Sequence, residues 1–258
     1  MSRISVAYGL SQIVAALVGG YASDKWGWLA PFAIGIGSSL LALFIIIPLK
    51  EEVNKDHQWT FKKFTGAINK KLLLISLLAM VGFFVAFSTL YGFSQTWAVK
   101  ELETDRQELG LVLFAMLVPY TLFLFLASRV QRFLGTSTTL ALGMVLLGLG
   151  AGFIPFSSSL IMLSLFQALA GAGLGLVYPT TMAESIKNVG ENVKDEVMGV
   201  FQSIYALGIF LGPVASGIIA TRLNLNWIFL FAGSLSIAAI ILVLLLAKTI
   251  KPKPTPIS

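Results

Sequence analysis

The sequence predicts an all-α membrane protein, a polytopic bundle of eight transmembrane helices. Hydrophobic residues make up 57% of its 258 residues and charged residues only 12%, whereas soluble domains carry about 25% charged residues. The mean hydropathy is +0.87. The apolar runs are unbroken and close to the roughly 20 residues that a helix needs to cross a bilayer core, and they do not alternate as the strands of a barrel would.

The apolar runs predict eight helices in order along the chain. They lie at residues 4–21, 29–49, 72–98, 109–128, 138–155, 160–181, 197–220 and 227–247. The third range is long enough to tilt or to break near Gly92.

Lysine and arginine predict the orientation, because cytoplasmic loops are enriched in them. With the N-terminus in the cytoplasm, 4 of the 18 basic residues fall outside, and the other 14 fall inside. The outer set is Lys25, Lys100, Arg106 and Arg222. We therefore expect a multi-pass plasma-membrane protein with both termini cytoplasmic. The net charge of +6 follows from this topology, so no nucleic-acid partner is expected.

The longest polar stretch, residues 50–71, divides the chain into a two-helix part and a six-helix part. We expect two helices in residues 1–49, an amphipathic linker at 50–71, a six-helix bundle at 72–248 and a cytoplasmic tail at 249–258. In the linker, Phe61, Phe64 and Ile68 recur at helical spacing, which predicts a short helix at the cytoplasmic interface. It serves either as a plain linker or as a regulatory segment. His57 in the linker is expected to be solvated.

The first predicted helix pair resembles the last. The matched positions are Tyr8, Leu10 and Gly20 with Tyr205, Leu207 and Gly217, and Trp28 and Phe32 with Trp227 and Phe231. Both copies run in the same direction. Parallel repeats related by an axis along the membrane normal are one transporter architecture.

The second copy carries Gly208-x-x-x-Gly212-Pro213-x-x-x-Gly217, and residues 128–135 read Ser-Arg-Val-Gln-Arg-Phe-Leu-Gly. The chain resembles the major facilitator superfamily, whose members have twelve helices in two six-helix halves. The glycine–proline pattern is similar to that of family helices five and eleven, and residues 128–135 resemble a cytoplasmic Asp-Arg-x-Gly loop with Gln131 in place of Asp. The resemblance implies family helices five to twelve, with helices one to four absent.

A second assignment of the first two helices stays open. Gly20-x-x-x-Asp24-Lys25-x-Gly27 is similar to the signature loop between family helices two and three. The repeat, the Trp-x-x-x-Phe pattern and the charge distribution favour helices five and six.

Polar and aromatic residues inside the spans predict a solute cavity, because amides and phenols hydrogen-bond a solute and rings bury its apolar part. The candidate residues are Gln12, Phe84, Phe87, Tyr91, Gln95, Tyr120, Gln167, Tyr178, Gln202 and Tyr205. On the third span, Phe84, Phe87 and Tyr91 are expected on one face. By resemblance, family helices seven, eight, ten and eleven line the central cavity. Interhelical hydrogen bonding remains the alternative for each residue.

Small residues inside the spans are expected to let helix backbones approach closely. Gly171 and Gly175 lie on the sixth span, and Gly208 and Gly212 on the seventh. Pro213 follows Gly212 and can bend its helix, since proline removes a backbone donor.

No catalytic constellation is evident, so an enzyme, a cofactor and a metal site are not expected. The chain has no cysteine and one histidine, and no carboxylate pair lies inside a span. Glu184, at the inner end of the sixth span, is the nearest candidate for proton coupling, and a plain loop charge is the alternative.

The predicted function is transport of a small neutral or amphipathic solute by alternating access. The resemblance to drug-efflux members favours a secondary transporter, a proton-coupled antiporter that works as a monomer with the solute and the lipid bilayer as partners. A non-transporting sensor or scaffold, or a truncated relic, is the alternative.

Overall fold

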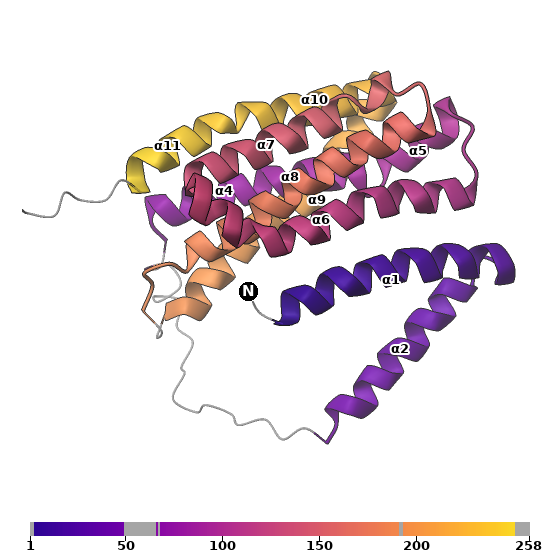
Figure 1. Ribbon diagram of the computed structural model, residues 1–258, viewed down its shortest axis with the longest axis horizontal. Coiled ribbons are helices and arrows are strands. Elements are labelled where there is room, and N and C mark those ends of the chain that lie inside the picture. Colours follow the sequence, from indigo (N-terminus) through magenta and orange to yellow (C-terminus); the bar gives the residue numbers. More distant parts are fainter. Residues whose placement is uncertain (1–2, 49–65, 67, 191–192, 251–258) are drawn as a thin grey trace, which may run out of the picture.

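The computed structural model describes residues 3–48, 66, 68–190 and 193–250, and over these residues its regular structure is helical throughout (Figure 1). The all-α fold class is therefore confirmed. The helices are α1 (Arg3–Trp26), α2 (Ala30–Ile46), α4 (Lys70–Val85), α5 (Phe93–Glu101), α6 (Arg106–Leu134), α7 (Thr136–Gly152), α8 (Leu160–Ser185), α9 (Lys194–Arg222), α10 (Leu225–Ala238) and α11 (Ile240–Ile250).

Five helical segments of the described chain are long and apolar enough to cross a membrane. They are Lys70–Glu101, Glu108–Leu134, Leu160–Ser185, Lys194–Arg222 and Leu225–Thr249. The apolar helices α2 and α7 each have 17 residues, which rise about 26 Å and reach the lower end of the spanning range. Helix α1 has 24 residues.

The third predicted span was expected to tilt or to break near Gly92, and the structure shows a break there. Helix α4 passes into a π-helical turn at Ala86–Leu90, and α5 begins at Phe93 after Gly92, whose backbone angles are φ −154° and ψ −64°. Single π-helical turns within α-helices are frequent at functional sites.

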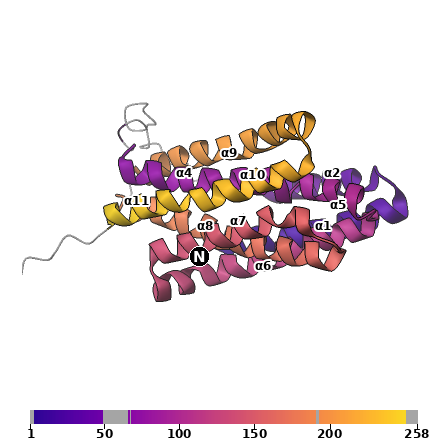
Figure 2. The same cartoon turned by 90° about the horizontal axis from the view of Figure 1, so that it is seen from above.

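The bundle is built around α4, which contacts α8 and α9 as well as α7, α10 and α11 (Figures 1 and 2). Helix α8 packs between α6 and α7. Helix α1 lies along α6, whereas α2 diverges from the bundle and has no buried residue (Figure 1).

Glycines set the closest approaches between helices. A Cβ atom on Gly171 of α8 would overlap the carbonyl oxygen of Met116 on α6, and one on Gly175 would lie 2.5 Å from the carbonyl oxygen of Tyr120. On α9, a Cβ atom on Gly208 would overlap the carbonyl oxygen of Met80.

Gly212, one turn after Gly208, would place a Cβ atom 2.8 Å from the carbonyl oxygen of Phe84 on α4. Helix α9 continues through Pro213 to Arg222. These contacts hold α8 against α6 and α9 against α4 at backbone distance.

Two sequence predictions lie outside the described residues. These are the interfacial helix around Phe61 and Phe64, with the solvated His57, and the tail beyond residue 250.

Two substitutions in α9 distinguish a glycine that is needed for close helix contact from one that only lowers helix propensity. Gly208→Ala should lower the stability of the protein in detergent by about 1–3 kcal/mol, because the new methyl group overlaps the α4 backbone. Gly217→Ala should be neutral or stabilising by up to about 1 kcal/mol, since no atom of another described helix lies within 4 Å of its Cβ position and alanine favours the helix. Equal thermal unfolding of the two variants would contradict the packing described above.

Candidate functional site

Five half-buried aromatic residues form a continuous series of ring contacts across α4, the π-helical turn that follows it, α8 and α9, which we call the aromatic ladder. Its members are Tyr91, Phe87, Phe83, Tyr178 and Tyr205. The rings of Phe87 and Tyr91 are 4.9 Å apart, those of Phe83 and Phe87 6.3 Å. All separations lie in the range in which aromatic rings attract one another.

Phe83 is the junction of the ladder. Its ring stacks on Tyr205 with centroids 4.7 Å apart and meets the edge of Tyr178 at 5.1 Å. The sequence prediction included Phe87, Tyr91, Tyr178 and Tyr205 but missed Phe83. The four-residue spacing of Phe83, Phe87 and Tyr91 was the available signal, because residues four apart share a helix face.

Phe84 does not join the ladder, so the expectation that it shares a face with Phe87 and Tyr91 is wrong. Its ring contacts Phe231 of α10 at 6.2 Å, and it lines a wholly apolar groove between α4, α9 and α10. On a helical wheel Phe87 lies about 40° from Phe83 and about 60° from Phe84, so periodicity alone does not decide which phenylalanine accompanies it.

Tyr91, the last residue of the ladder, opens into a pocket of about 490 Å³ that we call the Tyr91 pocket. It lies between the α1–α2 hairpin, the break before α5, and α6. Its lining residues are Gly19, Gly20, Ser23, Trp28, Pro31, Phe32, Tyr91, Gln95, Leu109, Gly110 and Leu113. The pocket thus joins two predicted cavity residues, Tyr91 and Gln95, to the first helix pair.

Gln167 lies in the interior of the bundle, away from the ladder. Its side chain is fully buried, and its Nε2 donates a hydrogen bond to Ser94 Oγ at 2.6 Å. Ser94 Oγ lies 3.1 Å from Gln95 Oε1. Interhelical hydrogen bonding, the alternative that the sequence left open, describes Gln167, and Ser94 is a partner that the sequence prediction missed.

The other predicted cavity residues are dispersed. Tyr120 is buried where α6 meets α8, and Gln202 is exposed on α9. Gln12 on α1 is half-buried, and its Oε1 has no hydrogen-bond partner among the described residues.

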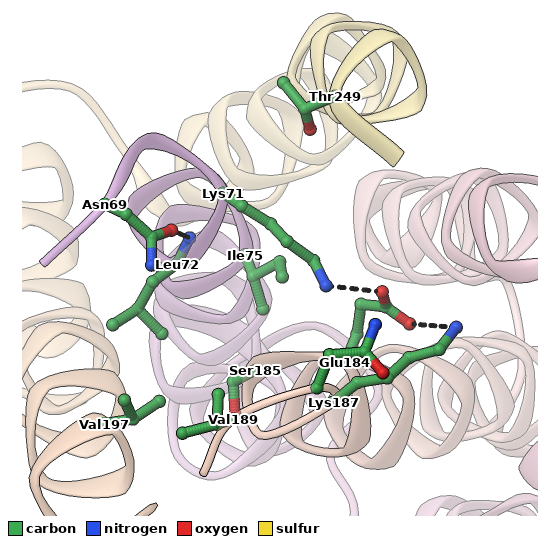
Figure 3. Close-up of a pocket in the computed structure, with 11 residues that line it drawn as sticks. Asn69, Lys71, Leu72, Ile75, Glu184, Ser185, Lys187, Val189, Val197 and Thr249 are labelled. Atoms are coloured by element: carbon green, nitrogen blue, oxygen red, sulfur yellow. Dashed lines mark hydrogen bonds and ion pairs between the residues drawn. The ribbon is translucent and has the colours of Figure 1, made fainter. Parts of the chain in front are cut away.

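A second pocket, of about 510 Å³, lies at the end of the bundle where α4 begins and α8 ends (Figure 3). We call it the Glu184 pocket. Its lining residues are Asn69, Lys71, Leu72, Ile75, Glu184, Ser185, Lys187, Asn188, Val189, Val197 and Thr249.

Glu184 is the buried charge of this pocket, with a side chain only 1% exposed. Its Oε1 lies 2.8 Å from Lys71 Nζ and its Oε2 lies 3.4 Å from Lys187 Nζ (Figure 3). The alternative of a plain loop charge is wrong, because α8 continues to Ser185 and carries Glu184 into the contact with α4. The spacing of Glu184 and Lys187 gave no sign of the more distant partner, Lys71.

No group of three His, Asp or Glu side chains in the described part of the chain is placed to hold a metal ion. The Tyr91 pocket offers aromatic rings and hydrogen-bonding groups, and the Glu184 pocket offers hydrogen-bonding groups and two ammonium groups. Such groups bind solutes or ions and fix helices.

Residues 72–258 match the family model described as the Major Facilitator Superfamily (MFS). The uncharacterized MFS-type transporter YceJ of Bacillus subtilis is 23% identical over 232 residues, covering 87% of this chain and 52% of YceJ. YhjO, another such transporter of Bacillus subtilis, is 27% identical over 154 residues, covering 57% of this chain and 37% of YhjO. A third, from Mycobacterium tuberculosis, is 24% identical over 169 residues, covering 63% of this chain and 25% of that protein.

The chain thus spans between a quarter and about half of the length of these relatives. The family match covers nearly all of α4 and every described helix after it. The chain therefore belongs to the Major Facilitator Superfamily.

Proposed function

We propose that this chain belongs to a secondary transporter that moves a small neutral or amphipathic solute by alternating access. The solute passes along the aromatic ladder and through the Tyr91 pocket, and its efflux is coupled to protons.

One observation supports the proposal. The half-buried aromatic ladder ends at the Tyr91 pocket, and residues from both parts of the chain line this pocket. The ladder residues are half-buried, and the Tyr91 pocket is lined by α1 and the α1–α2 turn on one side and by α6 on the other. None of the described residues that line it is charged. Aromatic rings and a few amide or hydroxyl groups suit a neutral solute with an apolar part.

The competing proposal is a membrane sensor or scaffold that does not transport. The divergent helix α2, with no buried residue, favours it, since an exposed apolar helix also suits a partner. Saturable solute binding in the Tyr91 pocket distinguishes the two proposals, because a scaffold needs no such site.

Proton coupling requires a group that takes up and releases a proton during the cycle. Glu184 is the candidate for that group in this chain, and its ion pair with Lys71 at 2.8 Å also joins α4 to α8. Solute movement by the whole protein in proteoliposomes should follow an imposed pH gradient, and movement indifferent to that gradient would refute the coupling.

The proposed orientation places both termini and the Glu184 pocket on the cytoplasmic side of the plasma membrane. A chain without cysteine allows a direct test with single cysteines at two exposed loop positions. In intact cells, an impermeant maleimide should label Ser158→Cys in the α7–α8 loop and should not label Asn188→Cys in the α8–α9 loop. The reverse pattern would contradict the orientation.

Two neighbouring phenylalanines test the solute path. We expect para-benzoylbenzamide, a neutral photoreactive carboxamide, to label the Tyr91 pocket saturably in the whole protein. Phe87→Ala should raise the half-saturating concentration about two- to tenfold, because it removes an aromatic contact from the ladder. Phe84→Ala is the matched control and should leave this concentration unchanged, since Phe84 faces α10. Equal shifts in the two variants, or no saturable labelling, would contradict the path.

The Lys71–Glu184 ion pair is tested by removing its partners singly and together. Lys71→Met should destabilise the protein by about 1–3 kcal/mol, a value reduced from that of a fully buried pair because Lys71 is partly exposed. Lys71→Met combined with Glu184→Gln should be more stable than Lys71→Met alone, since no buried carboxylate is left with only the longer contact to Lys187. Lys70→Met, at an exposed neighbour, is the control. Additive losses in thermal unfolding would show that the pair is not coupled.

A further inference from the structure

A chain of hydrogen bonds runs from the interior of the bundle to the wall of the Tyr91 pocket. Gln167 Nε2 on α8 donates to Ser94 Oγ on α5 at 2.6 Å. Ser94 Oγ donates to Leu90 O and to Gln95 Oε1, each at 3.1 Å. Gln95 Nε2 donates to Leu90 O at 3.0 Å. A residue of the core is thereby connected to a residue of the pocket.

This series of hydrogen bonds crosses the break in the third span. The π-helical turn ends at Leu90, and the carbonyl oxygen of Leu90 accepts from both the Ser94 and the Gln95 side chains. These hydrogen bonds therefore connect the backbone at the break to the side chain of Gln95, which lines the Tyr91 pocket.

Because two residues of this hydrogen-bond series are buried, breaking one of their bonds costs free energy. Gln167 and Ser94 are both fully buried, and a buried polar group that loses its partner costs about 1–3 kcal/mol. A serine hydroxyl carries a single proton. Gln167 donates to one lone pair of Ser94 Oγ and holds the hydroxyl group in place, and the single Ser94 proton is shared between Leu90 O and Gln95 Oε1.

These hydrogen bonds fix the amide of Gln95. Its oxygen accepts from Ser94 and its nitrogen donates to Leu90 O, which leaves one N–H and one oxygen lone pair for other partners. Leu90 O holds the nitrogen of the Gln95 amide and Ser94 holds its oxygen. Without the bond from Gln167, the Ser94 hydroxyl group loses the partner that holds it beside Gln95, and the Gln95 oxygen then loses its fixed direction.

We infer that Gln167 is a positioning residue for the solute, because through Ser94 it fixes the amide of Gln95 at the wall of the Tyr91 pocket. A fixed donor and acceptor side by side select a neutral solute that carries the complementary pair, such as a carboxamide. The rings of Tyr91 and Trp28, which line the same pocket, would contact its apolar part. This inference rests on the proposed solute path and adds the class of solute.

The test compares two photoreactive probes that differ in one group. Para-benzoylbenzamide carries a carboxamide, and para-methylbenzophenone has the same ring system with a methyl group in its place. Each is titrated against the whole protein in lipid nanodiscs, and labelling of the Tyr91 pocket is quantified by peptide mass spectrometry. Gln167→Leu should raise the half-saturating concentration of the carboxamide about two- to tenfold, as expected for one misplaced hydrogen bond, and should not change that of the methyl probe.

Changes at Ser94 and Gln95 provide the controls. Ser94→Ala should reproduce the effect of Gln167→Leu, and Ser94→Thr, which keeps the hydroxyl group, should restore carboxamide binding. If Gln167→Leu fails to fold, Ser94→Ala and Ser94→Thr still test whether the hydroxyl group at this position holds Gln95 for the carboxamide. In a Gln95→Ala background, Gln167→Leu should have no further effect on the carboxamide, because the group that it positions is gone.

Three results would overturn the inference. An equal loss of both probes would mean that Gln167 only packs the bundle, and no loss of either would mean that Ser94 holds Gln95 without it. If the wild-type protein binds neither probe saturably, the proposed solute path fails and the inference fails with it. The first two results leave the path intact, so the two failures are distinguishable.

Discussion

The rest of the structure depends on backbone contact between helices at glycine. Gly208 and Gly212 bring α9 onto the carbonyl groups of Met80 and Phe84, and this spacing lets Tyr205 stack on Phe83 at 4.7 Å. Gly171 and Gly175 hold α8 on α6 in the same way. In a bilayer the lipid tails are as apolar as the side chains, so close packing has to supply much of the attraction between helices. A larger residue at these sites would separate the helices that carry the aromatic ladder.

The broken span α4–α5 connects this packing to the solute path. Its first part is the centre of the bundle and carries Phe83 and Phe87 of the ladder. The break places Tyr91 and Gln95 in the Tyr91 pocket, opposite α1 and Trp28. The same element therefore contributes the most buried part of the core and the wall of the pocket. At the other end of α4, Lys71 is joined to Glu184 of α8, so both ends of the element are tied to α8, one by Ser94 and one by an ion pair.

The fold was largely predictable from the sequence because hydrophobic runs and their glycines report directly on membrane spans. The break near Gly92 was predictable for the same reason. The contacts between side chains were less predictable from the sequence. Phe83 and Phe84 are adjacent on a helix that is apolar on every side, and only the neighbours α9 and α10 decide which one meets Tyr205. Gln167 and Glu184 were recognised as unusual polar residues, but their partners Ser94 and Lys71 are 73 and 113 residues away in the chain. No local pattern pairs residues at that separation.

Alternating access as proposed above requires the α1–α2 hairpin and the helices α4 to α11 to move relative to each other around the Tyr91 pocket. Double electron–electron resonance between spin labels tests this motion directly, and these 258 residues contain no cysteine that would compete for the labels. Labels at the exposed positions Leu29, in the α1–α2 turn, and Lys100, at the end of α5, should give two distance populations in the whole protein. Their proportions should change when para-benzoylbenzamide is added, whereas a control pair at Lys100 and Leu223 within the bundle should keep one distance. A single Leu29–Lys100 distance that the probe does not change would contradict the account.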